Sequence, residues 1–259
     1  IHKRLFELSG ITDFSYDIKE IPSEELEENI AMLNSLDGYN ITIPHKVDII
    51  KYITKLDESA LRYNSVNCIN NTNGIITGYN TDCYGFLRAL KAGGAGLDGK
   101  VLQIGCGGAG RMITVEAIVH GADLTVVVLP EFISSAKEVV DNALLLNPNA
   151  KARVITNDEI DGDFDLLINA TPVGMYPHND ACPCSESVIK KCRFVFDIIY
   201  NPDETRLMAI AKENGIPAVG GMAMLVWQAV VAHEIWNNSK FNDDDIAKLI
   251  YDMRDELNK

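Results

Sequence analysis

The stretch Lys100-Val101-Leu102-Gln103-Ile104-Gly105-Cys106-Gly107-Gly108-Ala109-Gly110 decides the fold of this chain. It opens with a short apolar strand, and residues 112–119 after it have the length and apolar character of a helix. A strand, a G-x-G-x-x-G turn and a helix in this order describe a dinucleotide-binding unit. The glycines let the backbone approach a pyrophosphate, and the helix N-terminus offers it unpaired N–H groups. A glycine-rich turn that binds nothing is the alternative.

Strand and helix patterns alternate regularly from this unit onward. Apolar runs predict strands at 100–104, 124–129, 152–156, 165–169, 193–198 and 217–219. Between them, helical patterns cover 108–120, 133–146 and 204–214. Such alternation indicates a parallel sheet covered by helices on both faces, a Rossmann-like, doubly wound α/β arrangement.

The residues before Lys100 have a different pattern, which indicates a second α/β unit. Strands are expected at 14–21, 39–43, 65–70 and 75–79, the last two joined by a turn at Asn73-Gly74. Helices are expected from Ser23 to Leu36, from Pro44 to Ile53 and from Tyr84 to Lys91. The last 38 residues, from Met222, are expected to form two helices separated by a polar break at 238–245.

Composition excludes several classes of function. The net charge of −14 argues against partners such as nucleic acid and anionic membranes, which require basic patches. No apolar run is long enough to span a membrane, and no signal-peptide pattern is visible. The six cysteines form no C-x-x-C pair, and the five histidines are scattered. We therefore expect reduced thiols, no metal centre and a cytoplasmic location.

Three polar clusters of the first half hold candidate functional residues. Lys46 falls in the first turn of an expected helix, where a cation opposes the helix dipole, although an ordinary surface lysine is the alternative. Asn67 could hydrogen-bond a polyol or merely satisfy loop backbone. Asp82 could cap a helix, or share a substrate hydroxyl with Lys46 if the two lie together.

Three further clusters follow strands or open a helix in the second half. They are Asn169–Met175, Asp197–Pro202 and Gly220–Leu225, the last followed by Gln228. The first two follow neighbouring strands, so they are expected at the carboxyl edge of the sheet, where open α/β sheets bind ligands. Each alone could be a structural turn.

Taken together and in order, these clusters resemble the shikimate dehydrogenase family, which reduces 3-dehydroshikimate to shikimate with NADPH in aromatic amino-acid (chorismate) biosynthesis. The family's motifs are N-V-T-x-P-x-K at 40–46, G-A-V-N-T (loosely) at 64–68, G-x-N-T-D at 78–82, N-A-T-P-x-G-M at 169–175, D-x-x-Y-x-P at 197–202 and G-x-x-M-L-x-x-Q-A at 221–229. The match runs over nearly the whole chain.

The resemblance implies a role for each matching residue. Lys46 would be the general acid/base, and Asp82 would orient the same hydroxyl. The expected substrate-binding residues are Thr42, Asn67, Tyr200 and Gln228. The expected cofactor-binding residues are Gly105, Gly107, Gly108, Ala109, Gly110, Thr171, Met175 and Gly221; Glu131 is added to them not by the resemblance but by its place after the second strand of the predicted sheet.

The resemblance also implies two domains. Residues 1–84, completed by the C-terminal helices 222–259, would bind the small-molecule substrate, and residues 85–221 would bind the dinucleotide. We expect Lys46 and the nicotinamide to meet across the crevice between them, in a monomer or a homodimer.

Three departures from the family pattern leave the cofactor and the substrate open. NADP-dependent members carry Asn-Arg-Thr after the second Rossmann strand, but Val127–Phe132 contains no arginine. Glu131 instead lies about twenty residues past Gly110, where an acid can bind the 2′-hydroxyl of NAD; an exposed loop glutamate is the alternative. Asn64-Ser65 replaces Gly-Ala. The family's N-terminal Ser-x-Ser element is not in this chain, and we expect the natural protein to continue before Ile1.

Three functions therefore compete. The first is a shikimate dehydrogenase, using NADP or NAD. The second is an NAD-dependent quinate/shikimate dehydrogenase or a paralogue acting on another cyclic hydroxy acid. The third is a non-catalytic ligand-binding or regulatory protein with the same fold, against which the presence of both Lys46 and Asp82 argues.

Overall fold

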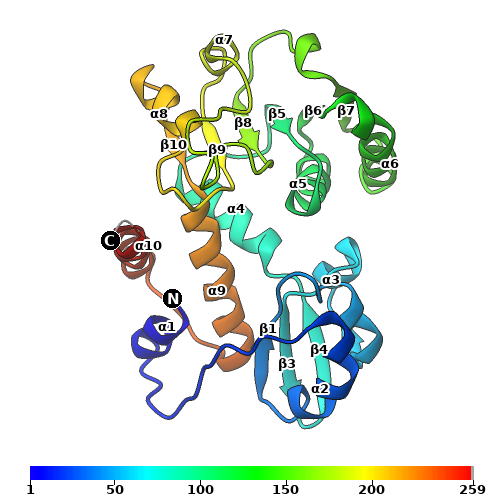
Figure 1. Ribbon diagram of the computed structural model, residues 1–259, viewed down its shortest axis with the longest axis vertical. Helices are drawn as coiled ribbons and strands as arrows, with labels where there is room; N and C mark the ends of the chain where they lie inside the picture. Colours follow the sequence, from blue (N-terminus) through cyan, green and yellow to red (C-terminus); the bar gives the residue numbers. More distant parts are fainter. Residues whose placement is uncertain (258–259) are drawn as a thin grey trace. The chain divides into compact units, whose positions relative to one another are not determined.

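The computed structural model describes residues 1–257, which fall into two compact units (Figure 1). The first comprises Ile1–Gly85 and Val226–Leu249. The second comprises Phe86–Leu225 and Ile250–Lys259, described as far as residue 257.

The second unit is built on a six-stranded sheet in the order β10-β9-β8-β5-β6-β7, with every neighbouring pair parallel. The strands are β5 (Lys100–Ile104), β6 (Asp123–Val127), β7 (Lys151–Ile155), β8 (Leu166–Asn169), β9 (Val195–Asp197) and β10 (Ala218–Val219). The chain continues from β5 to β6 on one side and later returns to β8 on the other. This reversal next to β5 is where doubly wound sheets bind ligands.

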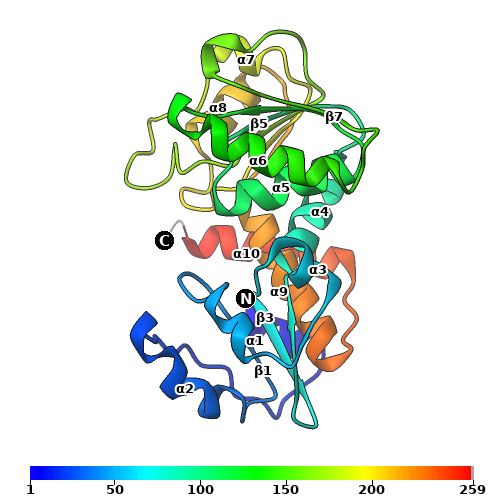
Figure 2. The same cartoon turned by 90° about the vertical axis from the view of Figure 1, so that its right-hand side faces the viewer.

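Helices cover both faces of this sheet. On one face α5 (Gly108–Val119) and α6 (Ile133–Leu144) lie side by side, and α8 (Arg206–Glu213) lies on the other, as Figures 1 and 2 show. A short helix, α7 (Glu186–Ile189), is on the side of α8 and was not expected. The parallel, doubly wound arrangement predicted from the alternation is confirmed.

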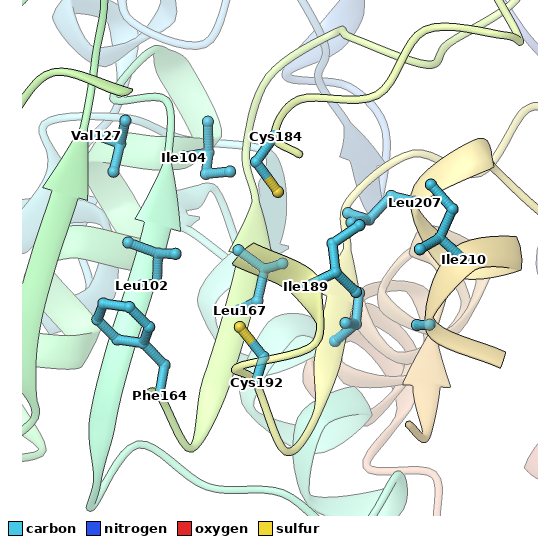
Figure 3. Close-up of a cluster of buried hydrophobic side chains, with 12 residues drawn as sticks. Leu102, Ile104, Val127, Phe164, Leu167, Cys184, Ile189, Cys192, Leu207 and Ile210 are labelled. Atoms are coloured by element: carbon cyan, nitrogen blue, oxygen red, sulfur yellow. The ribbon is translucent and has the colours of Figure 1, made fainter. Parts of the chain in front are cut away.

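A buried apolar cluster joins α7 and α8 to the sheet (Figure 3). Ile189, Leu207 and Ile210 from the helices pack with Leu102 and Leu167 from the two central strands. Burying such side chains stabilises the unit by roughly 1.5–3 kcal/mol each. The cluster therefore holds the strand ends of β5 and β8, which carry the candidate site residues, in fixed positions.

The first unit contains a four-stranded sheet in the order β1-β3-β4-β2. Its strands are β1 (Gly38–Asn40), β2 (Lys55–Leu56), β3 (Cys68–Thr72) and β4 (Ile75–Tyr79), with only β2 and β4 pairing in parallel. Its helical segments are α1 (His2–Leu8), η1 (Ser23–Glu25), α2 (Leu26–Leu33), η2 (Asp48–Tyr52) and α3 (Glu58–Tyr63). The predicted turn between β3 and β4 is confirmed, with Asn73 and Gly74 both at positive φ.

Three helices contain a boundary between the units along the chain: α4 (Asp82–Ala92), α9 (Gly221–Asn237) and α10 (Asp243–Leu257). The two predicted C-terminal helices are confirmed as α9 and α10. Within the first unit, the indole N–H of Trp236 donates to the backbone oxygen of Ile69 at 2.7 Å, which fixes the end of α9 on β3.

The predicted strand at 14–21 is wrong. No strand is described there, because its aromatic side chains pack against α1 instead of pairing edge to edge. Phe14 stacks on Phe6 with ring centroids 4.1 Å apart, and Tyr16 stacks on His2 at 4.3 Å.

The prediction of a helix from Pro44 to Ile53 is also wrong, both in the residue where the helix begins and in the type of helix. Residues 43–47 form turns, and only Asp48–Tyr52 is helical, as a 3₁₀ segment. Within residues 1–257, none of the helices combines the length and apolar character that crossing a membrane requires.

Candidate active site

Lys46 and Asp82 form an ion pair in the first unit. The Nζ atom of Lys46 lies 2.7 Å from Oδ2 of Asp82, and about a quarter of each side chain is exposed (27% and 25%). Lys46 lies in the turn before η2, where its backbone oxygen accepts from the N–H of Val66 at 2.8 Å. The prediction that Lys46 lies in the first turn of a helix is therefore wrong. Asp82 is the first residue of α4.

Asn67 fixes the other oxygen of this carboxylate. Its Nδ2 atom donates to Oδ1 of Asp82 at 2.9 Å and is also 3.1 Å from Oγ1 of Thr81. Its Oδ1 atom accepts from the backbone N–H of Thr81 at 2.7 Å. Both ends of the buried amide are thus engaged, so the orientation of Asp82 depends on Asn67.

Gln228 reaches the same cluster from α9. Its Oε1 atom lies 3.2 Å from the Thr81 hydroxyl and 3.4 Å from Nδ2 of Asn67, which is 161 residues away in sequence. The structure thus brings together one polar residue from each of four motifs: Lys46, Asn67, Asp82 and Gln228. Thr81 was not expected to take part, although its place inside the Gly78–Asp82 motif is a signal for it.

Thr42 lies in the same loop as Lys46 and is exposed. Its backbone oxygen accepts from the N–H of His45 at 3.0 Å. No described hydrogen bond joins its side chain to the cluster around Asp82.

The cluster in the first unit has the groups that acid/base chemistry on a hydroxyl requires. An ammonium can stabilise negative charge developing on an oxygen and deliver a proton to it. A carboxylate beside it can accept a hydrogen bond from the same hydroxyl. Because Asn67 and Thr81 are buried and mutually bonded, these two ionic groups have a rigid support.

The glycine-rich turn of the second unit has room for a ligand where side chains would otherwise stand. A Cβ atom added at Gly107 or Gly108 would meet no protein atom within 4 Å. Helix α5 begins at Gly108, and its N-cap residue, Gly107, provides no side-chain hydrogen bond. An open cradle before an uncapped helix N-terminus fits the pyrophosphate of a dinucleotide.

Two other glycines of the turn are required by the fold. Gly105 has φ +92°, and a Cβ there would lie 2.5 Å from Cγ2 of Thr171. A Cβ at Gly110 would lie 2.7 Å from the backbone oxygen of Gly105. Buried Gln103 supports the turn, because its Nε2 atom donates to the backbone oxygens of Gly105 (2.8 Å) and Gly110 (2.9 Å). Gln103 was not expected to contribute.

A second buried network ties together the loops after β8 and β9. Asn169 donates to Oδ1 of Asp197 at 3.0 Å, and the Thr171 hydroxyl donates to Oδ1 of Asn169 at 2.7 Å. The Thr205 hydroxyl donates to Oδ2 of Asp197 at 2.7 Å. Desolvation of the fully buried carboxyl raises the pKa of Asp197 to about 6, although the hydrogen bonds from Thr205, the backbone N–H of Ile199 and Asn169 lower it. Of these four residues, only Thr171 was expected in the site.

The remaining candidates of the second unit lie at strand ends or in loops. Met175 and Tyr200 are about half exposed (46% and 49%), in the loops after β8 and β9. Gly221 opens α9, and a Cβ there would collide with the backbone oxygen of Ile198. Glu131 is exposed in the 3₁₀ segment η3 (Pro130–Phe132) that follows β6.

Comparisons with known proteins match this arrangement. The family model for the shikimate dehydrogenase substrate binding domain matches residues 1–69. A protein of Caldanaerobacter subterraneus named shikimate dehydrogenase (NADP(+)) is 33% identical over 255 residues, which are 96% of this chain and 90% of that protein. The chain belongs to the shikimate dehydrogenase family. A relative of the same name from Nitrosopumilus maritimus is 35% identical over 92% of the chain and 87% of that protein.

Solved structures of this family share the fold. A chorismate mutase/shikimate 5-dehydrogenase fusion protein from Clostridium acetobutylicum superposes with a TM-score of 0.88 at 30% identity, covering 100% of this chain and 92% of that chain. The shikimate 5-dehydrogenase of Listeria monocytogenes, solved with shikimate and NAD, gives 0.84 at 28% identity, covering 96% and 90%. The predicted family and α/β fold class are confirmed.

Proposed function

We propose that this chain is an NAD(P)-dependent oxidoreductase that interconverts 3-dehydroshikimate and shikimate. The observation that carries the proposal is the Lys46–Asp82 ion pair, supported by Asn67 and Gln228 within a chain of the shikimate dehydrogenase family. The names of its relatives support the same reaction.

Lys46 acts as the general acid/base. When a ketone is reduced, negative charge develops on its oxygen, and the Lys46 ammonium stabilises this charge and supplies the proton. In the opposite direction the neutral amine removes the proton of the alcohol. Asp82 keeps Nζ directed to the reacting oxygen and accepts a hydrogen bond from the same hydroxyl, and its own position is fixed by Asn67.

Amide and hydroxyl groups of the first unit hold the ring of the substrate. Asn67, Gln228 and Thr42 supply donors and acceptors that suit a compound with several hydroxyl groups. Tyr200, in the loop after β9, stays a predicted substrate-binding residue. In this proposal residues 1–84 with 222–259 form the substrate domain, and residues 85–221 form the dinucleotide domain.

The second unit binds the nicotinamide dinucleotide, NADP or NAD, which supplies hydride chemistry when bound. The turn formed by Gly105, Gly107, Gly108, Ala109 and Gly110 would hold the pyrophosphate, whose charge the N-terminus of α5 would stabilise. Glu131 would bind the adenosine ribose of the dinucleotide, and Thr171, Met175 and Gly221 would hold its nicotinamide. The protein acts in the cytoplasm in aromatic amino-acid biosynthesis, as a monomer or a homodimer.

The test is to incubate the purified protein with shikimate or quinate, each with NADP⁺ and with NAD⁺, and to follow the absorbance of the reduced nicotinamide. We expect turnover with shikimate. Turnover with quinate alone would favour the quinate-oxidising alternative. No turnover in any pairing would contradict the proposal and favour a ligand-binding protein.

A further inference from the structure

The segments that follow β6 and β7 leave the sheet next to each other. β6 and β7 pair in parallel from Asp123↔Lys151 to Val127↔Ile155, and the N–H of Val128 donates to the backbone oxygen of Ile155 at 3.1 Å. β6 is also the neighbour of β5, after which the glycine turn begins. In dinucleotide-binding units the adenosine ribose lies over this end of the second strand.

Both segments place carboxylates at this edge. Glu131 is exposed in η3, after β6. Asp158 and Glu159 lie in η4 (Asn157–Glu159), after β7, in a turn whose capping box Thr156 and Glu159 form. Hydrogen bonds to Thr156 lower the pKa of both carboxyls, chiefly from its hydroxyl for Asp158 and from its backbone N–H for Glu159. Both groups are therefore ionised at neutral pH.

No positive charge balances these carboxylates within the two segments. Residues 128–136 and 156–163 contain neither lysine nor arginine. Among the flanking cations, Arg153 donates its Nε–H to the hydroxyl of Thr125 in mid-strand at 3.0 Å, and its charge contributes to lowering the pKa of Glu159 but not that of Asp158. Arg111 lies in the first turn of α5, beside the glycine turn, and Lys137 in the second turn of α6. A 2′-phosphate at this edge would therefore meet carboxylates.

We propose that Glu131 determines cofactor specificity and that this chain binds NAD(H) in preference to NADP(H). A carboxylate accepts hydrogen bonds from the 2′-hydroxyl of the ribose and repels a 2′-phosphate, so it both favours one cofactor and rejects the other. This inference rests on the proposed function. It assigns to this chain a cofactor preference that differs from the NADP(+) in the names of its relatives.

Isothermal titration calorimetry of the whole protein with NAD⁺ and with NADP⁺, without substrate, tests the inference. We expect NAD⁺ to bind at least about tenfold more tightly at low ionic strength, and the ratio to shrink as added salt screens the repulsion of the 2′-phosphate. Glu131→Arg should reduce or reverse the preference. Asp141→Arg makes the same change of charge on the exposed side of α6 and should leave it unchanged.

Tighter binding of NADP⁺ by the unaltered protein would overturn the inference, and so would equal effects of Glu131→Arg and Asp141→Arg. If NADP⁺ binds more tightly and shikimate is still oxidised, only the cofactor preference is wrong. If neither dinucleotide binds, the proposed function fails together with this inference.

Discussion

Asp82 holds Lys46 with one carboxylate oxygen and Asn67 with the other: Nζ of Lys46 lies 2.7 Å from Oδ2, and Nδ2 of Asn67 lies 2.9 Å from Oδ1. The carboxylate therefore cannot turn without breaking one of these two bonds. Because Asn67 is itself buried and bonded to Thr81, the direction of the ammonium depends on a rigid core.

Asn67→Ala should destabilise the first unit. It leaves the buried N–H of Thr81 without its acceptor, and an unsatisfied buried group costs about 1–3 kcal/mol. Urea unfolding measures the loss. Asn70→Ala is the control: Asn70 lies in β3, which begins just after Asn67, and its side chain makes a single exposed bond to Thr72, so the change should cost less than about 0.5 kcal/mol. Equal effects of the two changes would contradict the supporting role of Asn67.

Gly108→Ala and Gly110→Ala should separate ligand binding from folding. A methyl at Gly108 meets no protein atom, so the midpoint of thermal unfolding should stay unchanged. The affinity for the dinucleotide should fall, because the methyl would occupy the space proposed for the pyrophosphate. A methyl at Gly110 lies 2.7 Å from the backbone oxygen of Gly105, so that variant should lose stability as well. Calorimetric binding and thermal unfolding check both. Unchanged dinucleotide affinity in Gly108→Ala would argue against a cradle at this turn.

Asp197→Asn should alter how stability depends on pH. Burial raises the pKa of Asp197 from 3.8 to about 6, so between these values the folded state holds a proton that the unfolded state has released. The contribution of this group is therefore present in full below about pH 4 and is lost as the pH rises through 6, by roughly 3 kcal/mol.

Asparagine resembles the protonated acid in shape and hydrogen bonding. We expect Asp197→Asn to be more stable than the unaltered protein at neutral pH, with the difference vanishing toward about pH 4. Urea unfolding across this range provides the measurement. A difference that does not vary with pH would show that the buried carboxyl is not the titrating group.

The side chains of Arg254 and Asp203 should stabilise the second unit through their interaction with each other. The Nη2 atom of Arg254, on α10, donates to Oδ2 of Asp203 at 2.9 Å while its Nε donates to Oδ1, which joins α10 to the loop that carries Tyr200. The side chain of Asp203 is only 15% exposed, so a double-mutant cycle to alanine should give a coupling of about 1 kcal/mol. Arg254→Lys cannot reproduce both bonds and should retain only part of it. A coupling free energy near zero would contradict the view that this ion pair stabilises the contact between α10 and the loop that carries Tyr200.

Much of the second unit could be predicted from the sequence, because its strands are continuous apolar runs separated by helical patterns. β5 has the predicted bounds, Lys100–Ile104. The prediction for segment 14–21 failed for a physical reason. The alternation of apolar and polar residues fits a strand, but here it places Phe14 and Tyr16 where they pack against α1. Local pattern does not distinguish packing on a helix from pairing with a strand.

The candidate site could be predicted at the level of motifs but not of contacts. The motifs supplied Lys46, Asn67, Asp82 and Gln228, although nothing local indicates that α9 meets β3. The supporting groups, Gln103 beneath the glycine turn and Thr205 beneath Asp197, were missed. Their role lies in side-chain hydrogen bonds between segments that only the fold brings together.

The most direct test of the account is kcat for the oxidation of shikimate by Lys46→Met compared with the unaltered protein. The account predicts a fall of at least about 100-fold, the range expected for loss of a general acid/base, with circular dichroism and dinucleotide affinity unchanged. A kcat within about threefold of the unaltered protein would contradict it, since acid/base catalysis contributes far more than that.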